Sequence, residues 1–256
     1  MNVLTACILL VTADTHSAGF SSRLFDAMYT YTDDSTRALA GDVVDLPGEW
    51  GQDWTRRLRE YGFWGVPGNH DDAAGFRAHS EMARVVCGDP EQPDFVAFGI
   101  DSEQVLGSYG SGLGWAQENY PDTPWVILTH RPFVSCIHAE GHGLLDRAWG
   151  QRAVATFPTG TVVVAGHEHV WCQAHMEGWT QIVVSTGGGK RYECGRHLPE
   201  NITCEYLPDY PTFVRLDPRL DDLAIVGLTP DGTTERHLSI LEGDGSWMEI
   251  DPAPPL

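Results

Sequence analysis

Five short segments of the chain combine aspartate, histidine and asparagine at the close spacing that metal sites use. They are Asp14-Thr15-His16, Gly41-Asp42-Val43-Val44-Asp45, Gly68-Asn69-His70-Asp71, His130 and Gly166-His167-Glu168-His169. Carboxylate, imidazole and amide ligands without a thiolate favour Mn, Fe, Zn, Ni or Co over calcium. A carboxylate at the end of an apolar strand can bridge two such ions, and Asp42 is the candidate for this bridging position.

Four of the segments follow a short apolar run of β-branched or aromatic residues, which predicts a buried strand before each of them. These runs are residues 3–11, 63–66, 125–128 and 162–165, and Asp42 follows a further strand expected near residues 36–40. One segment alone is also typical of an ordinary turn, but strand ends of an α/β sheet converge, so five together predict a common site. Because extended backbone points residues i and i+2 the same way, His167 and His169 should face this site and Glu168 should point elsewhere.

Taken in order, the five segments resemble the blocks D-x-H, G-D-x-x-D, G-N-H-D/E, H and G-H-x-H of the calcineurin-like metallophosphoesterase superfamily. The resemblance implies an α/β fold, a four-layer α-β-β-α sandwich of two mixed sheets flanked by helices, with the metal site at the strand ends. Within the superfamily, the endings of the third and fourth blocks look most like the cyclic-nucleotide phosphodiesterase and purple-acid-phosphatase-like branches. The implied activity is hydrolysis of small phosphomonoesters or phosphodiesters by a metal-bound hydroxide.

The resemblance also assigns roles to individual residues, which imply two divalent transition-metal ions that share Asp42. The implied ligands of one ion are Asp14, His16, Asp42 and His169, and those of the other are Asp42, Asn69, His130 and His167. His70 matches a histidine that stabilises the transition state and protonates the leaving group, and Asp45 matches the carboxylate that orients it. Arg131 could bind the substrate phosphate or pair on the surface.

Some positions depart from the relatives or stay open. Leu46 stands where the phosphoprotein phosphatase branch has arginine, and Asp45 stands where purple acid phosphatases have a tyrosine ligand, so no charge-transfer colour is expected. Asp71 could support the ligands or cap the following turn. His138 and His142 could be extra ligands, although surface histidines in loops are more common.

The net charge of −20 limits the partners of this chain of 256 residues. Lys190 is the only lysine, and a strongly acidic surface repels polyanions, so nucleic acid is an unlikely partner. We therefore expect a small phosphoester as substrate. Two alternatives remain, a metal-dependent nuclease with a hidden basic groove and a catalytically silent scaffold of the same fold; the intact His70 argues against the scaffold.

The length predicts one phosphoesterase domain, residues 1–245, followed by a proline-rich tail, residues 246–256. The N-terminal apolar run has no preceding positive charge and reads as a strand rather than a signal peptide, and nothing else is long enough to span a membrane. We expect a cytoplasmic protein with mostly reduced cysteines, although Cys194 and Cys204 could pair in an oxidising compartment. The oligomeric state is not predicted.

The remaining elements follow from local patterns. Helices are expected at residues 21–28, 54–61, 76–86 and 144–156, and further strands at 95–100, 171–175, 181–185, 212–216, 223–228 and 236–241. Glycine, serine and aromatic residues predict a loop over residues 102–120 with a single helical turn near Trp115. Residues 132–143 and 186–212 are the other long loops.

Overall fold

Two mixed β-sheets form the centre of the fold in the computed structural model. It describes residues 2–4, 7–16, 21–31, 35–43, 60, 62–71, 84–103, 109–137, 142–184, 192–205, 211–217, 222–229, 232–239 and 247–248. The first sheet has the strand order β1-β5-β6-β7-β8-β10-β9-β11. These strands are β1 (Asn2–Leu4), β5 (Arg84–Asp89), β6 (Gln92–Ile100), β7 (Trp125–Thr129), β8 (Thr161–Ala165), β10 (Trp179–Val183), β9 (Trp171–Met176) and β11 (Ile202–Glu205).

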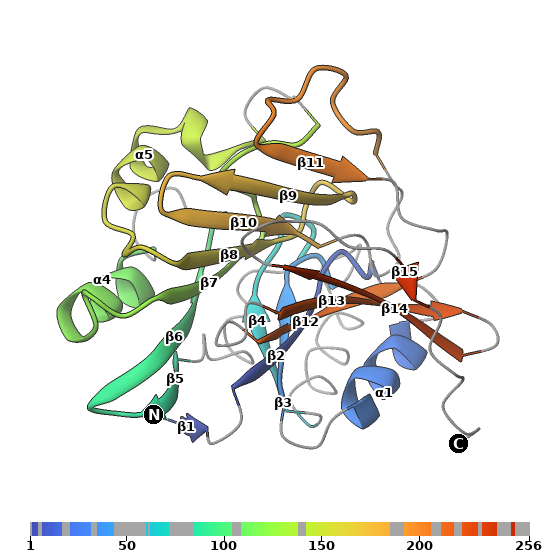
Figure 1. The fold of residues 1–256 in the computed structure, drawn as a ribbon, viewed down its shortest axis with the longest axis horizontal. Coiled ribbons are helices and arrows are strands. Elements are labelled where there is room, and N and C mark those ends of the chain that lie inside the picture. Colours follow the sequence, from blue (N-terminus) through green and yellow to red (C-terminus); the bar gives the residue numbers. More distant parts are fainter. Residues whose placement is uncertain are drawn as a thin grey trace.

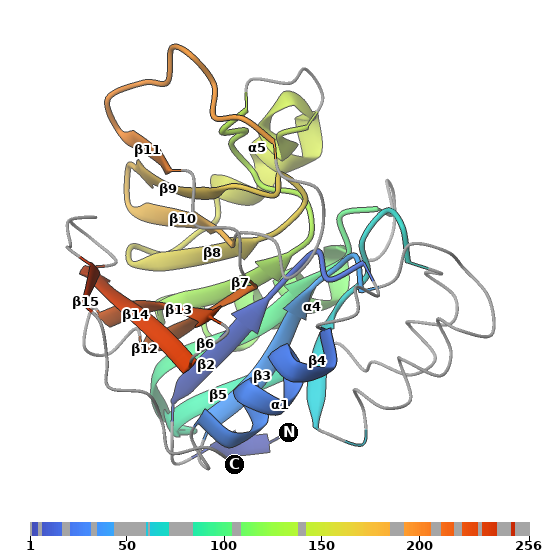
Figure 2. The ribbon, with the colours of Figure 1, turned by 90° about the vertical axis from the view of Figure 1, so that its right-hand side faces the viewer.

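The second sheet has the order β15-β14-β13-β12-β2-β3-β4. Its strands are β15 (Trp247–Met248), β14 (Gly232–Ser239), β13 (Asp222–Thr229), β12 (Thr212–Asp217), β2 (Ile8–Thr12), β3 (Ser35–Ala40) and β4 (Phe63–Val66). Strands β2, β3 and β4 are parallel, as are β6, β7, β8 and β10 in the first sheet, whereas the outer hairpins are antiparallel. Figure 2 shows the three parallel strands side by side.

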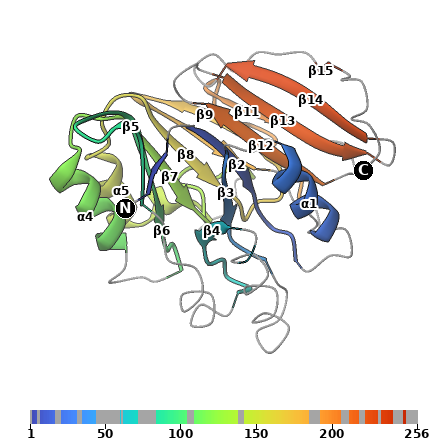
Figure 3. The ribbon, with the colours of Figure 1, turned by 90° about the horizontal axis from the view of Figure 1, so that it is seen from below.

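Successive side chains of β6 point to opposite faces of the first sheet, and this shows how the layers of the fold pack. Phe95 and Ala97 join the core between the sheets, whereas Phe98 and Ile100 face the helices on the other side. There the first sheet is covered by α4 (Tyr109–Asn119) and α5 (Ala148–Val154), while α1 (Ser21–Tyr31) packs Phe25 against the second sheet. In Figures 1 and 3 these helices lie outside the two sheets. The predicted α-β-β-α sandwich is therefore confirmed.

Five parallel strands end at one edge of this sandwich. Strands β2, β3 and β4 belong to the second sheet and β7 and β8 to the first, and each is followed by one of the five ligand segments. Strands β2, β4, β7 and β8 are almost wholly buried, which agrees with their continuous apolar sequences, whereas β3 is buried only over its last three residues. The fold thus brings segments from both sheets to a single edge.

Several local predictions were wrong. Residues 84–86 belong to strand β5 rather than to a helix, and residues 109–119 form a complete helix rather than one turn. The run at residues 3–11 is divided between β1 and β2, which lie in different sheets, and β11 lies within a predicted loop. Strand β15 pairs with β14, so the sheet continues past the predicted boundary at residue 245. The helix expected at residues 54–61 lies almost entirely outside the described residues, as does the remainder, residues 76–83, of the helix expected at 76–86.

The expectation of mostly reduced cysteines was also wrong. All six cysteines are paired, as Cys7–Cys87, Cys136–Cys172 and Cys194–Cys204. The first bridge joins the start of β2 in the second sheet to β5 in the first, so it connects the sheets across their shared core. Among the described residues, no helix has the length and apolar character needed to cross a membrane.

Candidate metal centre

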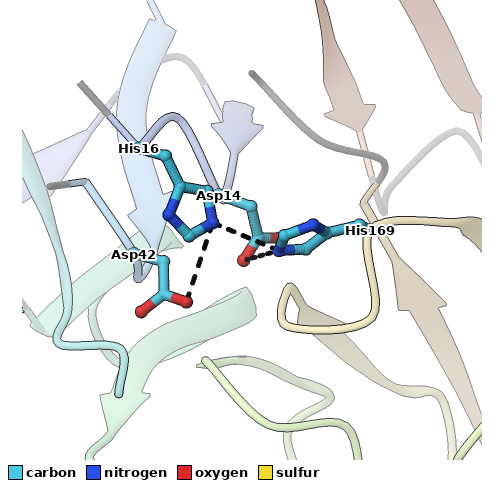
Figure 4. Close-up of side chains that lie close together, drawn as sticks. All are labelled: Asp14, His16, Asp42 and His169. Atoms are coloured by element: carbon cyan, nitrogen blue, oxygen red, sulfur yellow. Dashed lines mark hydrogen bonds and ion pairs between the residues drawn. The ribbon is translucent and has the colours of Figure 1, made fainter. Parts of the chain in front are cut away.

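Four of the predicted ligands form one cluster at the strand ends. Ligand atoms of Asp14, His16, Asp42 and His169 all lie within 4.8 Å of one another. The Nε2 atoms of His16 and His169 are 3.2 Å apart, and His169 Nε2 lies 3.4 Å from Asp14 Oδ1. Figure 4 shows the imidazoles of His16 and His169 converging with the two carboxylates. This group matches the set that the resemblance implies for the first ion.

The second predicted set surrounds the imidazole of His130, which is fully buried. His130 Nε2 lies 3.0 Å from Asn69 Oδ1, 3.2 Å from His167 Nδ1 and 3.3 Å from Asp42 Oδ2. On the other side of the ring, Nδ1 is 2.8 Å from the carbonyl oxygen of Ala40. A carbonyl only accepts, so Nδ1 carries a hydrogen, and Nε2 is the ring nitrogen that would bind a metal ion after losing its proton.

Asp42 belongs to both groups. Its Oδ2 is 3.3 Å from His130 Nε2 and 4.0 Å from His16 Nε2, while Oδ1 accepts a 2.9 Å hydrogen bond from the backbone N–H of His70. One carboxylate oxygen therefore faces both sets of imidazoles. The other oxygen holds the carboxylate in this orientation.

Left-handed backbone accompanies the ligand positions. In the described part of the chain, positive φ at residues other than glycine occurs at Asp14, His16, Asp42, His167 and His169. Such conformations cost free energy for non-glycine residues and concentrate at functional sites. The predicted extended geometry at i and i+2 is therefore wrong in detail, although both side chains of each pair reach the site.

Glycines in the ligand segments allow the strand ends to approach. A Cβ at Gly41, which has φ +84°, would lie 2.5 Å from His130 Nδ1, and one at Gly166 would lie 2.6 Å from the Cβ of Ala13. A Cβ at Gly68 would overlap the carboxylate and backbone nitrogen of Asp42. Each of these glycines stands directly before a predicted ligand. A side chain at any of the three positions would push neighbouring strand ends apart.

Hydrogen bonds then join the loops to one another. The carboxylate of Asp71 accepts from the N–H groups of Val43 and Gly68, at 2.9 and 2.8 Å, so Asp71 supports the site by connecting two loops. Glu168 is buried and accepts from the N–H of Cys136 at 2.7 Å, pointing away from the cluster as predicted. These hydrogen bonds therefore help to hold the ligand loops in place, in addition to any bound metal.

The protein environment changes the pKa values of three of these groups. Burial alone would raise the pKa of Asp42, but the hydrogen bond and charge of His130, with His70 N–H and His16, lower it. Burial alone would lower the pKa of His130, but Asp42 raises it to about 9. Burial and the charges of His130 and Arg131 lower the pKa of His167 to about 2. Asp42 is thus ionised and His167 neutral, as metal ligands must be, whereas His130 would release a proton when a metal ion binds.

The sequence pattern of the calcineurin-like phosphoesterase family matches residues 9–171. This match covers more than half of the chain and includes all five ligand segments. The chain belongs to the calcineurin-like phosphoesterase family. A search among curated protein sequences found no significant match.

Solved structures show the calcineurin-like fold in distant proteins. GAP50, described as the anchor in the inner membrane complex of Plasmodium, has 10% identity and a TM-score of 0.60, over 95% of this chain and 89% of that chain. The purple acid phosphatase PPD1 from yellow lupin (Lupinus luteus) seeds has 10% identity and a TM-score of 0.54, over 97% of this chain and 56% of that one. At such identity the likeness concerns the fold alone.

Arg131 lies at the rim of this calcineurin-like site, and its surroundings were not visible in the sequence. Its guanidinium pairs with Glu103 through bonds of 2.8 and 3.2 Å, and Nη1 lies 2.8 Å from His167 Nε2. The backbone N–H of Arg131 donates to Ser102 Oγ at 3.0 Å. Nothing in the local sequence of Glu103 indicates this role, because the pairing depends on how β6 and β7 end side by side.

Three further rings surround the ligands. His70 is exposed, with its ring centroid 5.1 Å from that of His16. The His142 ring lies 4.8 Å from His167, and Tyr192, which sequence reasoning missed, lies 5.1 Å from His169. Asp45 and His138 lie outside the described residues, so their predicted roles stay predictions.

The donor set fits divalent transition metals. It combines buried carboxylates, imidazoles and one amide oxygen, and all six cysteines are engaged in disulfides. A divalent cation could bind these closely spaced donor atoms and would offset the negative charge of Asp42. The geometry can therefore hold metal ions in the two groups that share Asp42.

Proposed function

We propose that this chain is a dinuclear metal-dependent phosphoesterase that hydrolyses small phosphomonoesters or phosphodiesters. The observation that carries the proposal is the position of Asp42 Oδ2, which lies 3.3 Å from His130 Nε2 and 4.0 Å from His16 Nε2. Membership of the calcineurin-like phosphoesterase family supports hydrolysis of a phosphoester. Under this proposal the seven residues form two ligand sets, namely Asp14, His16, Asp42 and His169, and Asp42, Asn69, His130 and His167.

When bound, the two ions would supply Lewis-acid activation of water and charge stabilisation at the phosphoryl oxygens. The chain's own residues hold the geometry in which this chemistry can occur. The carbonyl of Ala40 fixes the His130 ring, and the His70 N–H fixes the Asp42 carboxylate. Manganese, iron, zinc, nickel and cobalt are all compatible with this donor set.

His70 and Arg131 would act on the substrate itself. His70 is exposed beside His16, within reach of a leaving oxygen, and its predicted role is to protonate that oxygen, with Asp45 orienting the ring. Arg131 is held by Glu103 next to His167, where unused donors of its guanidinium could meet a phosphate oxygen. A paired and partly buried arginine suits one phosphate group better than a long polyanion.

The acidic composition supports a small substrate over the nuclease alternative. With a net charge of −20, the chain has few cations for the repeated phosphate contacts of nucleic acid. The scaffold alternative is opposed by the joint presence of both ligand groups and His70. The single domain predicted at residues 1–245 remains part of this proposal, with its sheet extended to β15.

The cytoplasmic location stays a prediction, and the cysteine pairing opposes it. Disulfides persist in oxidising compartments and are rare in reducing cytosol. Three disulfides in one chain therefore favour an oxidising environment for the folded protein.

The test of the proposal is the substitution Asp42→Asn. Because the negative charge of Asp42 would offset both cations, its loss should lower the occupancy of both sites together and abolish phosphoester hydrolysis. Metal analysis after dialysis against Mn or Zn should find two ions per chain in the parent protein and fewer than one in the variant.

A matched control is Asp217→Asn, which changes a buried aspartate at the opposite end of the second sheet. This control should keep two ions and full activity. Undiminished metal content in Asp42→Asn would remove the basis for a shared ligand.

A further inference from the structure

A row of rings crosses the candidate site. His70 lies 5.1 Å from His16, His16 lies 5.0 Å from His169, and His169 lies 5.1 Å from Tyr192, measured between ring centroids. The inner two rings, His16 and His169, carry ligand atoms, whereas His70 and Tyr192 are exposed. The site is therefore bordered by a histidine on the His16 side and by a phenol ring on the His169 side.

Tyr192 has an unusual environment for an exposed aromatic residue. The described part of the chain has two exposed large hydrophobic residues, Tyr29 at 49% and Tyr192 at 44%. The guanidinium of Arg37 covers the Tyr29 ring at 4.8 Å, far from the site. Tyr192 instead rests against a ligand histidine at an interplanar angle of 40°, and nearly half of its surface remains open to solvent beside the cluster.

Covalent and hydrogen bonds fix the segment that carries Tyr192. Cys194 is bonded to Cys204 on β11, and the N–H of Gly195 donates to the carbonyl of Cys136 at 2.9 Å. Cys136 is bonded in turn to Cys172, three residues beyond His169. An aromatic ring held in this way loses little conformational entropy when a ligand stacks on it.

We infer that Tyr192 is a specificity residue that stacks on a planar ring in the retained arm of a phosphodiester substrate. The inference rests on the proposed function and names its substrate class. If the leaving oxygen faces His70, the other ester arm of a phosphate bound at the proposed metal site beside His16 and His169 would extend toward Tyr192. A monoester has no such second arm. Stacking between aromatic groups then favours diesters with an aryl or heterocyclic group in that position.

The test compares two diesters that share a leaving group, bis(4-nitrophenyl) phosphate and methyl 4-nitrophenyl phosphate. Tyr192→Ala should raise KM for the bis-aryl diester by about 3- to 10-fold, with kcat unchanged, and should leave KM for the methyl diester unchanged. Tyr192→Phe should behave as the parent because stacking does not need the hydroxyl. Tyr29→Ala, the matched exposed tyrosine, should change neither substrate. Equal effects of Tyr192→Ala on both diesters would overturn the inference.

A binding measurement separates this inference from the proposed function. Manganese-loaded protein should bind methyl(phenyl)phosphinate, which has two arms as a diester does, more tightly than dimethylphosphinate in calorimetry, and Tyr192→Ala should abolish that preference. Both ligands resist hydrolysis, so the result does not depend on turnover. Hydrolysis of neither diester would contradict the proposed function, while a phenyl preference that depends on Tyr192 would still support the inference. Absence of any phenyl preference in the parent protein would overturn it.

Discussion

His70 is exposed, whereas most of the ligand side chains around it are buried. Its backbone N–H donates to Asp42 Oδ1, and its ring meets the edge of the cluster at His16. The backbone of His70 therefore supports the ligands, while its side chain is available for proton transfer. Replacing the side chain should separate these two contributions.

His70→Ala should keep the metal content of the parent protein, because the hydrogen bond to Asp42 comes from the backbone. Turnover of alkyl phosphoesters should fall by about 10²- to 10⁴-fold, since their leaving groups need a proton. Aryl phosphoesters have good leaving groups and should lose much less. The measurement is kcat on ethyl and phenyl esters together with metal analysis; equal losses on both would argue against proton donation.

The left-handed backbone at five ligand residues is a second feature at this scale. His16 has φ +48°, and its imidazole Nε2 lies 3.2 Å from that of His169. Asparagine and aspartate adopt this backbone region more readily than most non-glycine residues, because their short polar side chains can form local hydrogen bonds. The backbone conformation that directs the His16 side chain into the site therefore lowers the free energy of unfolding of the protein.

His16→Asn should raise the free energy of unfolding of the metal-free protein by up to about 1 kcal/mol while weakening metal binding. Chemical denaturation with and without chelator measures both effects. The matched control is His175→Asn in strand β9, where asparagine is disfavoured and stability should fall. A loss of stability of equal size in both variants would contradict the backbone argument.

At the scale of elements, strands β2, β7 and β8 before the ligand segments were predictable because each is a continuous buried run rich in β-branched residues. Helix α4 was not, since its glycines lower helix propensity. A Cβ at Gly112 would lie 2.9 Å from the Phe98 ring, so this glycine allows the helix to pack closely on β6. Tertiary packing overrides local preference there.

In the candidate site, too, some residues could be predicted from the sequence and others could not. Its ligands were visible because each segment has a local pattern, and the structure places all seven together. Tyr192 and Glu103 were not visible, because each reaches the site through a contact between segments distant in sequence. Short edge strands such as β11 have too few residues for alternation to be recognised.

Gly68→Ala should disturb the contact between the loops after β3 and β4, because the new methyl group would overlap Asp42. We expect loss of bound metal and a decrease in the free energy of unfolding of about 1–3 kcal/mol. Gly114→Ala is the control, since nothing lies within 4 Å of a Cβ there, and alanine should stabilise α4 by about 1 kcal/mol. Thermal denaturation and metal analysis report both outcomes; unchanged metal content in Gly68→Ala would show that the loops can adjust.

At the scale of the whole molecule, the net charge of −20 decides between short-range and long-range recognition. Contacts between a small phosphoester and metal ions act over short distances and are weakly screened by salt, whereas attraction of a polyanion depends on many exposed cations. The two substrate classes should therefore respond differently to ionic strength.

Hydrolysis of nitrophenyl or bis-nitrophenyl phosphate should change little as salt rises from low to physiological concentration. Duplex or single-stranded DNA should be cleaved poorly at every concentration, because the acidic surface repels it. Initial rates measured across a salt series test this expectation. Efficient DNA cleavage that collapses steeply with added salt would favour the nuclease alternative.

The Cys7–Cys87 and Cys136–Cys172 bridges close two covalent loops of the chain that do not overlap in sequence. The first encloses Asp14, His16, Asp42 and Asn69, the second encloses His167 and His169, and His130 lies between them. A cut between Glu103 and Tyr109 would thus yield two fragments with their own bridges intact, joined along the seam of β6 and β7. Each proposed ion takes ligands from both fragments, so metal binding would report how well a split version of this protein reassembles.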